Sequence, residues 1–176
     1  MGGYRVYDDQ YPYFITSGIT FGLPLFSNPA ITEIILENLN FLQEKRDVKI
    51  YSYVIMENHL HAVIQGKDLA VKVGRFKSFS AREIIDLMHE KRHTRWLKRL
   101  KKVMPINKTD RDFQFWESGY RPKQMLSDEI MIQKIEYIHN NPVKRGYVDK
   151  PEDWRYSSAR NYAGLPGLIP VTLFEI

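Results

Sequence analysis

Two runs rich in β-branched and aromatic residues, separated by a turn, constrain the fold of this chain more than any other stretch. The runs are 49–56 and 59–65, and Glu57-Asn58 between them suits a tight turn. Residues of this kind favour extended backbone, so the two runs predict an antiparallel hairpin.

Two histidines stand in the second run with one bulky apolar residue between them. In a strand, residues i and i+2 share a face, so His59 and His61 project together while Leu60 turns to the opposite face. Two imidazoles side by side on a rigid strand make half of a metal site. The alternative, that both are ordinary and partly exposed strand residues, stays open on spacing alone.

Other enzymes that use a His-x-His pair fit this chain less well. Metallo-hydrolases with such a pair usually continue to a nearby Asp and a further His, whereas Ala-Val-Ile-Gln follows here. Barrel amidohydrolases need roughly 250 residues. This chain has 176 residues.

The rest of the chain alternates between strand and helix patterns. Strands are expected at 11–21 and 113–120, and helices are expected at 28–47, from 69 to about 87, and at 127–140. This order predicts an α+β, ferredoxin-like split βαβ fold, with a four-stranded antiparallel sheet and two helices on one face. The third helix is an addition to that core, and an irregular C-terminal tail follows it.

Length and composition indicate one domain, with a core at about 11–148 and a tail at 149–176. The sequence contains no run of 18 apolar residues, so it predicts no membrane span. The first residues lack the apolar segment of a signal peptide. The chain has no cysteine, which suits a reducing compartment. We therefore expect a cytoplasmic protein without a membrane partner.

Positive charge is concentrated in one segment. Residues 72–102 carry eleven Lys and Arg against three Asp and Glu, a net charge of +8, which leaves −3 for the rest of a chain of net charge +5. Such a stripe favours a polyanion, most simply nucleic acid, although a solvated helix face explains it as well. Residues 88–102 either continue the second helix or form a basic arm.

A second group of polar residues lies on the third helix. Ile135 and Ile138 belong to its apolar stripe, and Tyr137 lies about 100° round from Ile138. Asn141 is four residues after Tyr137, so the phenol and the amide share one side of the helix. The ordinary interpretations are that Tyr137 is one of eleven tyrosines packed on the sheet and that Asn141 ends the helix before Pro142.

Brought together, these groups have a coherent chemistry. A divalent cation held by two imidazoles and an amide oxygen would bind the oxygens of a scissile phosphate and orient it for in-line attack. The oxygen of Tyr137 would attack and join covalently to DNA. Lys134, one turn earlier, is a candidate for stabilising the phenolate.

Four stretches of the chain resemble the REP-associated tyrosine transposases, which belong to the single-tyrosine HUH transposases, where HUH means His-hydrophobic-His. They are Met56–His61 (MENHLH), Trp116–Tyr120 (WESGY), Tyr137–Gly146 (YIHNNPVKRG) and Trp154–Ser158 (WRYSS). The similarity extends from the first strand to about Tyr162. The segment 88–109 is longer and more basic than in compact members of that family.

The resemblance implies an enzyme that nicks single-stranded DNA near hairpins in DNA transposition and recombination. His59 and His61 then match the metal ligands, Asn141 stands where relatives place a third ligand, and Tyr137 matches the nucleophile. Magnesium or manganese is the implied cofactor and a 5′-phosphotyrosine link the implied intermediate. The implied partner is single-stranded DNA with a palindromic hairpin, bound by a monomer or a homodimer and associated with the nucleoid when bound.

Because contacts to backbone phosphates dominate affinity for DNA, basic residues are the candidate DNA contacts. They lie in three parts of the chain. They are Arg75, Lys77 and Arg82 on the second helix, Arg121 and Lys123 after the fourth strand, and Lys144 and Arg145 after the third helix. Two other functions stay open: a DNA-hairpin-binding regulator without catalysis, and a metal-dependent phosphoesterase acting on small nucleotides.

Overall fold

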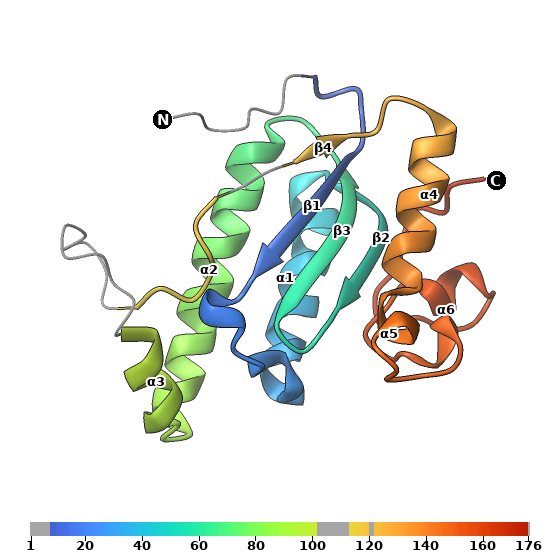
Figure 1. The fold of residues 1–176 in the computed structure, drawn as a ribbon. Coiled ribbons are helices and arrows are strands. Elements are labelled where there is room, and N and C mark those ends of the chain that lie inside the picture. Colours follow the sequence, from blue (N-terminus) through green and yellow to red (C-terminus); the bar gives the residue numbers. More distant parts are fainter. Residues whose placement is uncertain (1–7, 102–112, 120–121, 176) are drawn as a thin grey trace.

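The chain folds around one antiparallel sheet. The computed structural model describes residues 8–101, 113–119 and 122–175. Its sheet has the strand order β2-β3-β1-β4, and every neighbouring pair is antiparallel (Figure 1). The strands are β1 (Tyr13–Gly18), β2 (Lys49–Ile55), β3 (His59–Gln65) and β4 (Lys123–Gln124).

Strands β2 and β3 form the predicted hairpin. Met56 N donates to His59 O at 2.8 Å and closes the turn, and the register pairs Ile55 with Leu60 and Val54 with His61. The β-branched residues of both runs are buried on one face or the other, as the composition of the runs indicates.

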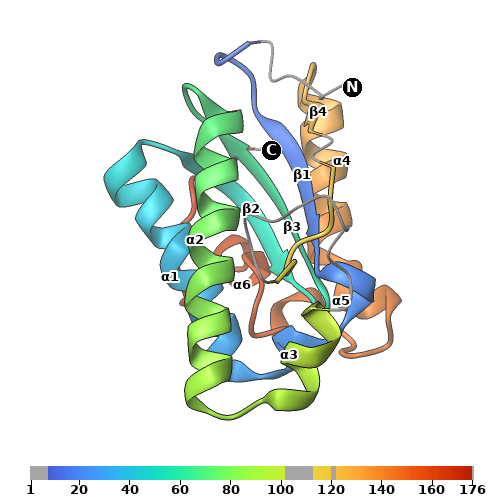
Figure 2. The same cartoon turned by 90° about the vertical axis from the view of Figure 1, so that its left-hand side faces the viewer.

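Two helices cover one face of this sheet. They are α1 (Pro29–Arg46) and α2 (Leu69–Glu90), which Figure 2 shows on the side of the sheet away from α4. The Asn28 side chain caps α1 by accepting a hydrogen bond from Ala30 N at 3.0 Å, and proline follows at the first helical position. The apolar stripe of α1 packs with Leu60 and Ile64 of β3 in one continuous core.

A third helix lies on the opposite face. It is α4 (Asp128–His139), whose first turn is capped by Ser127 and carries two acids. Its buried stripe, Met131, Ile135 and Ile138, packs on Phe14, Val54 and Val63 in a second core. The four-stranded sheet with two helices on one face and an added helix is therefore confirmed.

The C-terminal segment is largely irregular, as expected, and covers the edge of β2. It contains α5 (Asn141–Lys144), η3 (Pro151–Asp153) and α6 (Ala159–Tyr162). Ile55 N donates to Tyr156 O at 2.9 Å, and Tyr53 N donates to Ser158 Oγ at 2.9 Å. An open strand edge invites pairing with other chains, and these bonds satisfy it.

The prediction of a fourth strand at 113–120 is wrong. Within that range Trp116 makes an isolated bridge to Ile19, and β4 comes later and has two residues. Phe115 and Trp116 are both buried, and both rings contact Phe26. Successive residues of a strand face opposite ways, so this stretch cannot be regular strand.

Two other boundaries also differ from expectation. The first strand ends at Gly18, and the chain then turns through two short 3₁₀ helices, η1 (Thr20–Gly22) and η2 (Leu25–Ser27). The basic segment does not simply continue α2, because the chain turns at 91–93, where Arg92 has a φ of 57°. It then forms α3 (Thr94–Lys101), which buries Leu97 and Leu100, and the remainder to residue 109 lies outside the described residues.

Among the described residues, no helix combines the length and the apolar character that crossing a membrane requires.

Leu60, on the face of β3 opposite the histidines, should contribute strongly to the stability of the fold. Its side chain is fully buried in the α1 and α2 core, between the two histidines in sequence. Leu60→Ala should lower the free energy of unfolding by about 2–5 kcal/mol, through lost burial and the cavity left behind. Urea titration measures this. Leu173→Ala, at an exposed leucine, is the control and should change stability by about 0.5 kcal/mol or less.

Candidate active site

Three rings from two elements converge on the α4 face of the sheet. The ring centroids of His59 and His61 are 4.6 Å apart, and the centroids of His61 and Tyr137 are 5.5 Å apart. The histidines project together because they alternate with buried Leu60, as predicted. Tyr137 reaches them because α4 buries the neighbouring Ile138 against the same sheet face. The fold thus assembles the two groups that the sequence singled out separately.

Strand β1 holds His61 from one side. Thr16 is paired with His61 in the β1–β3 ladder, and Thr16 Oγ1 lies 2.8 Å from His61 Nδ1. The Phe14 ring stacks on the imidazole, with centroids 5.3 Å apart and an interplanar angle of 26°. Phe14 also meets the Tyr137 ring edge-on at 6.0 Å. The His61 imidazole is therefore fixed by a hydrogen bond and a stacked ring.

The Asn58 amide holds His59. Its Nδ2 donates to the Gly22 carbonyl at 3.3 Å, so its Oδ1 is the atom that faces His59 Nδ1 at 2.6 Å. An amide oxygen accepts only, so the proton of this hydrogen bond sits on His59 Nδ1. His59 Nε2 is then left with its lone pair, as a metal ligand requires.

Both imidazoles are held neutral. Burial lowers the pKa of His61 to about 3, and the neighbouring His59 and Lys134 act in the same direction. Burial also lowers the pKa of His59, an effect that Glu57 opposes and Arg145 reinforces. Neutral imidazole is the form that binds metal, so the electrostatics of the pair suit a ligand role.

Positive groups surround the tyrosine. Lys134 Nζ lies 5.3 Å and Lys144 Nζ 5.6 Å from the centroid of the Tyr137 ring. Arg145 Nη2 lies 3.5 Å from Glu57 Oε1, beside the histidine turn. Tyr137 is 37% exposed, so an anion from solvent can reach it.

The predicted DNA contacts divide between the two faces. Lys144 and Arg145 lie at the site, and Lys123 joins them on the same face because its β4 position is paired with Phe14 of β1. Arg75 and Arg82 lie on α2, which packs on the other face. Arg121 is outside the described residues.

The side chain of Lys77, also on α2, already makes contacts within the fold. Its Nζ donates to Glu117 O at 3.2 Å and lies 5.7 Å from the centroid of the Trp116 ring. Burial lowers the pKa of Lys77, while Glu117 opposes that change. In the structure, therefore, none of the three α2 residues Arg75, Lys77 and Arg82 lies against the histidine pair.

Asn141 begins α5, directly after the turn that ends α4. In the described part of the chain no hydrogen bond joins its side chain to either histidine. The same residues contain no group of three His, Cys, Asp or Glu side chains able to hold a metal ion. The donor set in place is therefore the histidine pair, which fits a cation that takes its other ligands from an amide, water or substrate oxygen.

Two contributors to the site were missed from the sequence. Asn58 and Glu57 were predicted only as turn residues, yet one orients His59 and the other pairs with Arg145. Both partners come from elsewhere in the chain, Gly22 and Arg145, so no local spacing reveals them. Their position beside the histidine motif is the only signal in the sequence.

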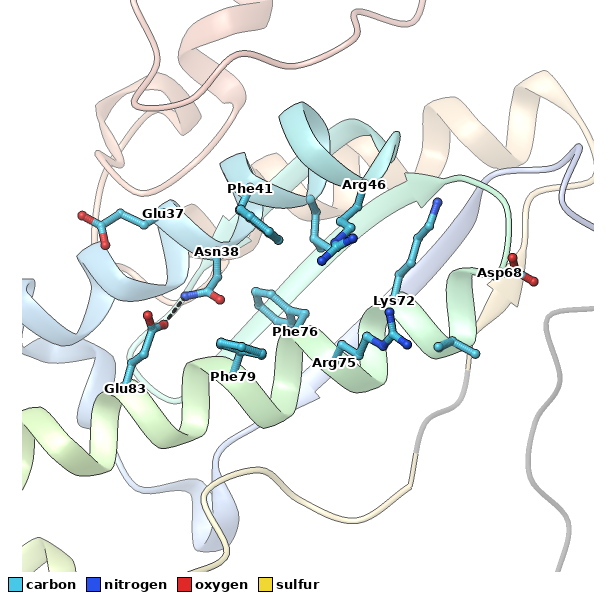
Figure 3. Close-up of a pocket in the computed structure, with 12 residues that line it drawn as sticks. Glu37, Asn38, Phe41, Arg46, Asp68, Lys72, Arg75, Phe76, Phe79 and Glu83 are labelled. Atoms are coloured by element: carbon cyan, nitrogen blue, oxygen red, sulfur yellow. Dashed lines mark hydrogen bonds between the residues drawn. The ribbon is translucent and has the colours of Figure 1, made fainter.

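A cavity of about 640 Å³ lies between α1 and α2, away from the histidines. Figure 3 shows Phe41, Phe76 and Phe79 in its middle, with Arg46 and Arg75 toward one end. Arg75, expected to contact DNA, lines this cavity instead of the histidine face.

Fold and site together define a class: a ferredoxin-like protein whose strand histidine pair faces a tyrosine on an added helix. No protein-family model matches the chain. A Haemophilus influenzae protein, itself only provisionally assigned as a REP-associated tyrosine transposase, is 25% identical over 111 residues. That match covers 59% of this chain and 54% of the relative, or about half the relative's length.

A solved structure is similar over the whole chain. It is a REP-associated tyrosine transposase bound to a REP hairpin, with a TM-score of 0.61 and 18% identity, and it covers 100% of this chain and 95% of that one. The structural match shows the shared fold. The sequence match to the Haemophilus influenzae protein agrees with the family resemblance carried by the sequence motifs, and the structural match agrees with the fold which that resemblance implies.

His139 gives the site's supporting helix a predictable pH dependence. It is buried, with Nε2 2.9 Å from Ser158 Oγ, and burial lowers its pKa to about 4. The unfolded chain, with a histidine pKa of about 6.5, takes up the proton first as pH falls. The contribution of neutral His139 to the free energy of unfolding is therefore fully present above about pH 6.5. It falls by about 3 kcal/mol as the pH is lowered from there to about pH 4.

His139→Gln should remove that component, so its free energy of unfolding falls less steeply between those pH values than that of the parent. Urea titrations at several pH values measure the slope. His89→Gln, at an exposed position of α2, should retain the parent slope. A His139→Gln slope equal to the parent's would refute the assignment.

Proposed function

We propose that the protein is a metal-assisted, single-stranded DNA endonuclease and strand transferase of the REP-associated tyrosine transposase kind. The observation that carries this is the convergence of His59, His61 and Tyr137 on one face of the sheet. Metal ligands and a nucleophile are the two parts that such a reaction requires.

The substrate we propose is DNA carrying a hairpin. Lys123, Lys144 and Arg145 lie on the same face as the site, where they would contact backbone phosphates. The similar solved structure holds a REP hairpin, which supports the same class of partner here. In a cell, such a protein would act in the cytoplasm, on the nucleoid.

His59 and His61 would hold the cation through their Nε2 atoms, since each Nδ1 is already hydrogen-bonded. Asn141 is the proposed third ligand. Bound magnesium or manganese would withdraw charge from the scissile phosphate and orient it for in-line attack.

Tyr137 would then form a bond from its phenolic oxygen to phosphorus, as the bond from phosphorus to the 3′ oxygen breaks. The phenolic proton is lost, and the departing 3′ oxygen gains a proton to become a hydroxyl. The DNA is left as a 5′-phosphotyrosine ester, which a 3′ hydroxyl can later attack to rejoin a strand. Lys134 and Lys144, beside the ring, would lie close to the oxygens of the attacked phosphate.

The contact between Tyr137 and His61 occurs within one chain. This supports a reaction in which each chain uses its own tyrosine. A monomer would then suffice, and a homodimer would contain two complete sites.

A covalent trapping assay tests the proposal. The protein is mixed with labelled single-stranded hairpin oligonucleotides and Mn²⁺, then resolved on a denaturing gel. We expect a protein–DNA band that disappears with chelator, with Tyr137→Phe and with His59→Ala. Tyr11→Phe is the matched control, because Tyr11 is 39% exposed and Tyr137 37%.

A band that survives Tyr137→Phe would place the nucleophile elsewhere. Tight hairpin binding without any band would favour the regulator without catalysis. Cleavage that ignores DNA structure would favour the small-nucleotide phosphoesterase.

Thr16 provides a test of metal binding that needs no DNA. Its hydroxyl bonds His61 Nδ1, and loss of such an outer partner typically weakens metal affinity about 10- to 100-fold. Thr16→Val should show this loss in a Mn²⁺ titration followed by electron paramagnetic resonance. Thr172→Val, at an exposed threonine, should bind Mn²⁺ like the parent. Equal affinity in Thr16→Val would show that the hydroxyl does not support the ligand.

A further inference from the structure

One aromatic side chain beside the histidine turn is mostly exposed to solvent. Phe21 is 69% exposed, more than any other large apolar side chain of the described residues. No ring contact in that part of the chain involves it. Its neighbours Ile19, Thr20 and Leu23 are buried, so Phe21 projects alone from a packed loop.

The backbone at Phe21 is strained. Its φ is 60° and its ψ is 19°, in the left-handed region, and Gly22 after it also has a φ of 60°. A bulky side chain with positive φ is a real outlier, and glycine would fit there without strain. The loop thus keeps a large ring in solvent at a position where the backbone favours having no side chain at all.

The loop is rigidly joined to the site. Ile19 N donates to Asn58 O at 2.8 Å, and Phe26 N donates to Glu57 O at 3.0 Å. The Asn58 side chain bridges Gly22 O and His59 Nδ1, so Phe21 is one residue from a hydrogen-bonded link to the imidazole. On the other side, Thr20 N donates to Phe115 O at 2.9 Å.

We infer that Phe21 is a stacking platform for one unpaired base of the DNA strand that lies across the histidine pair. This inference rests on the proposed function and identifies how the single-stranded part of the substrate is recognised. A single rigid ring with an open face suits one base, whereas a protein partner would need a wider apolar patch. Strained backbone held in place by its surroundings is typical of ligand contacts.

The test is a binding measurement without metal, on hairpins with and without a single-stranded flank. The flank carries 2-aminopurine at one position at a time, so that stacking quenches its fluorescence. Phe21→Leu should weaken binding of the flanked hairpin about 5- to 100-fold and abolish the quenching at one position. It should bind the hairpin without a flank like the parent. Phe21→Trp, which keeps a planar ring, should retain both the affinity and the quenching.

Phe79→Leu is the matched control, because Phe79 is 62% exposed but lies on α2. It should bind both hairpins like the parent. Phe21→Leu should unfold in urea at the same concentration as the parent, because Phe21 is 69% exposed, and this separates loss of binding from loss of folding.

Equal affinity of Phe21→Leu and the parent for the flanked hairpin would overturn the inference. So would an equal loss on both hairpins, which would indicate a change in the loop itself. The covalent trapping assay keeps the two hypotheses apart. If the parent forms the adduct and Phe21→Leu binds normally, only the stacking role fails. If the parent forms no adduct but quenching depends on Phe21, only catalysis fails.

Discussion

The pairing of β1 with β3 is the constraint on which the rest of the structure depends. It sets Thr16 opposite His61 and Gly18 opposite His59, and it therefore decides which side chains share a face. A shift of the register by one residue would move every side chain of the strand to the other face. The histidines would then enter the α1 and α2 core, and Leu60 would meet the tyrosine helix.

This register also explains how one sheet combines a stable core with a polar site. The α1 and α2 face is continuously apolar, and Leu60, Ala62 and Ile64 of β3 are buried there. On the α4 face the apolar contacts end at Phe14 and Val63, and the imidazoles begin. Burial beside that apolar edge keeps the imidazoles neutral, which is the protonation state that the proposed cation site requires.

Much of this was predictable, because local periodicity determines which residues of one element share a face. The hairpin, the helices that begin near residues 28 and 127, the stripe of α4 and the facing histidines all follow from patterns along the chain. The predictions fail where contacts between residues distant in the sequence determine the local structure or the role of a side chain. Phe115 and Trp116 look like alternating strand residues, but both pack on Phe26. The amide of Asn58 gains its role only from Gly22, which a strand pattern cannot show.

The distribution of charge shows the same limit of sequence reasoning. The strongly basic segment begins on α2 and continues into α3, yet α2 packs on the face opposite the histidines. Charges in solvent are screened beyond a Debye length of about 8–10 Å, so a cation across the sheet contributes little to the potential at Tyr137. Lys134, Lys144 and Arg145 matter more there, although they belong to a part of the chain with no unusual excess of positive charge. The potential at Tyr137 is therefore determined by which cations the fold brings near it, and a count of charges along the sequence does not show this.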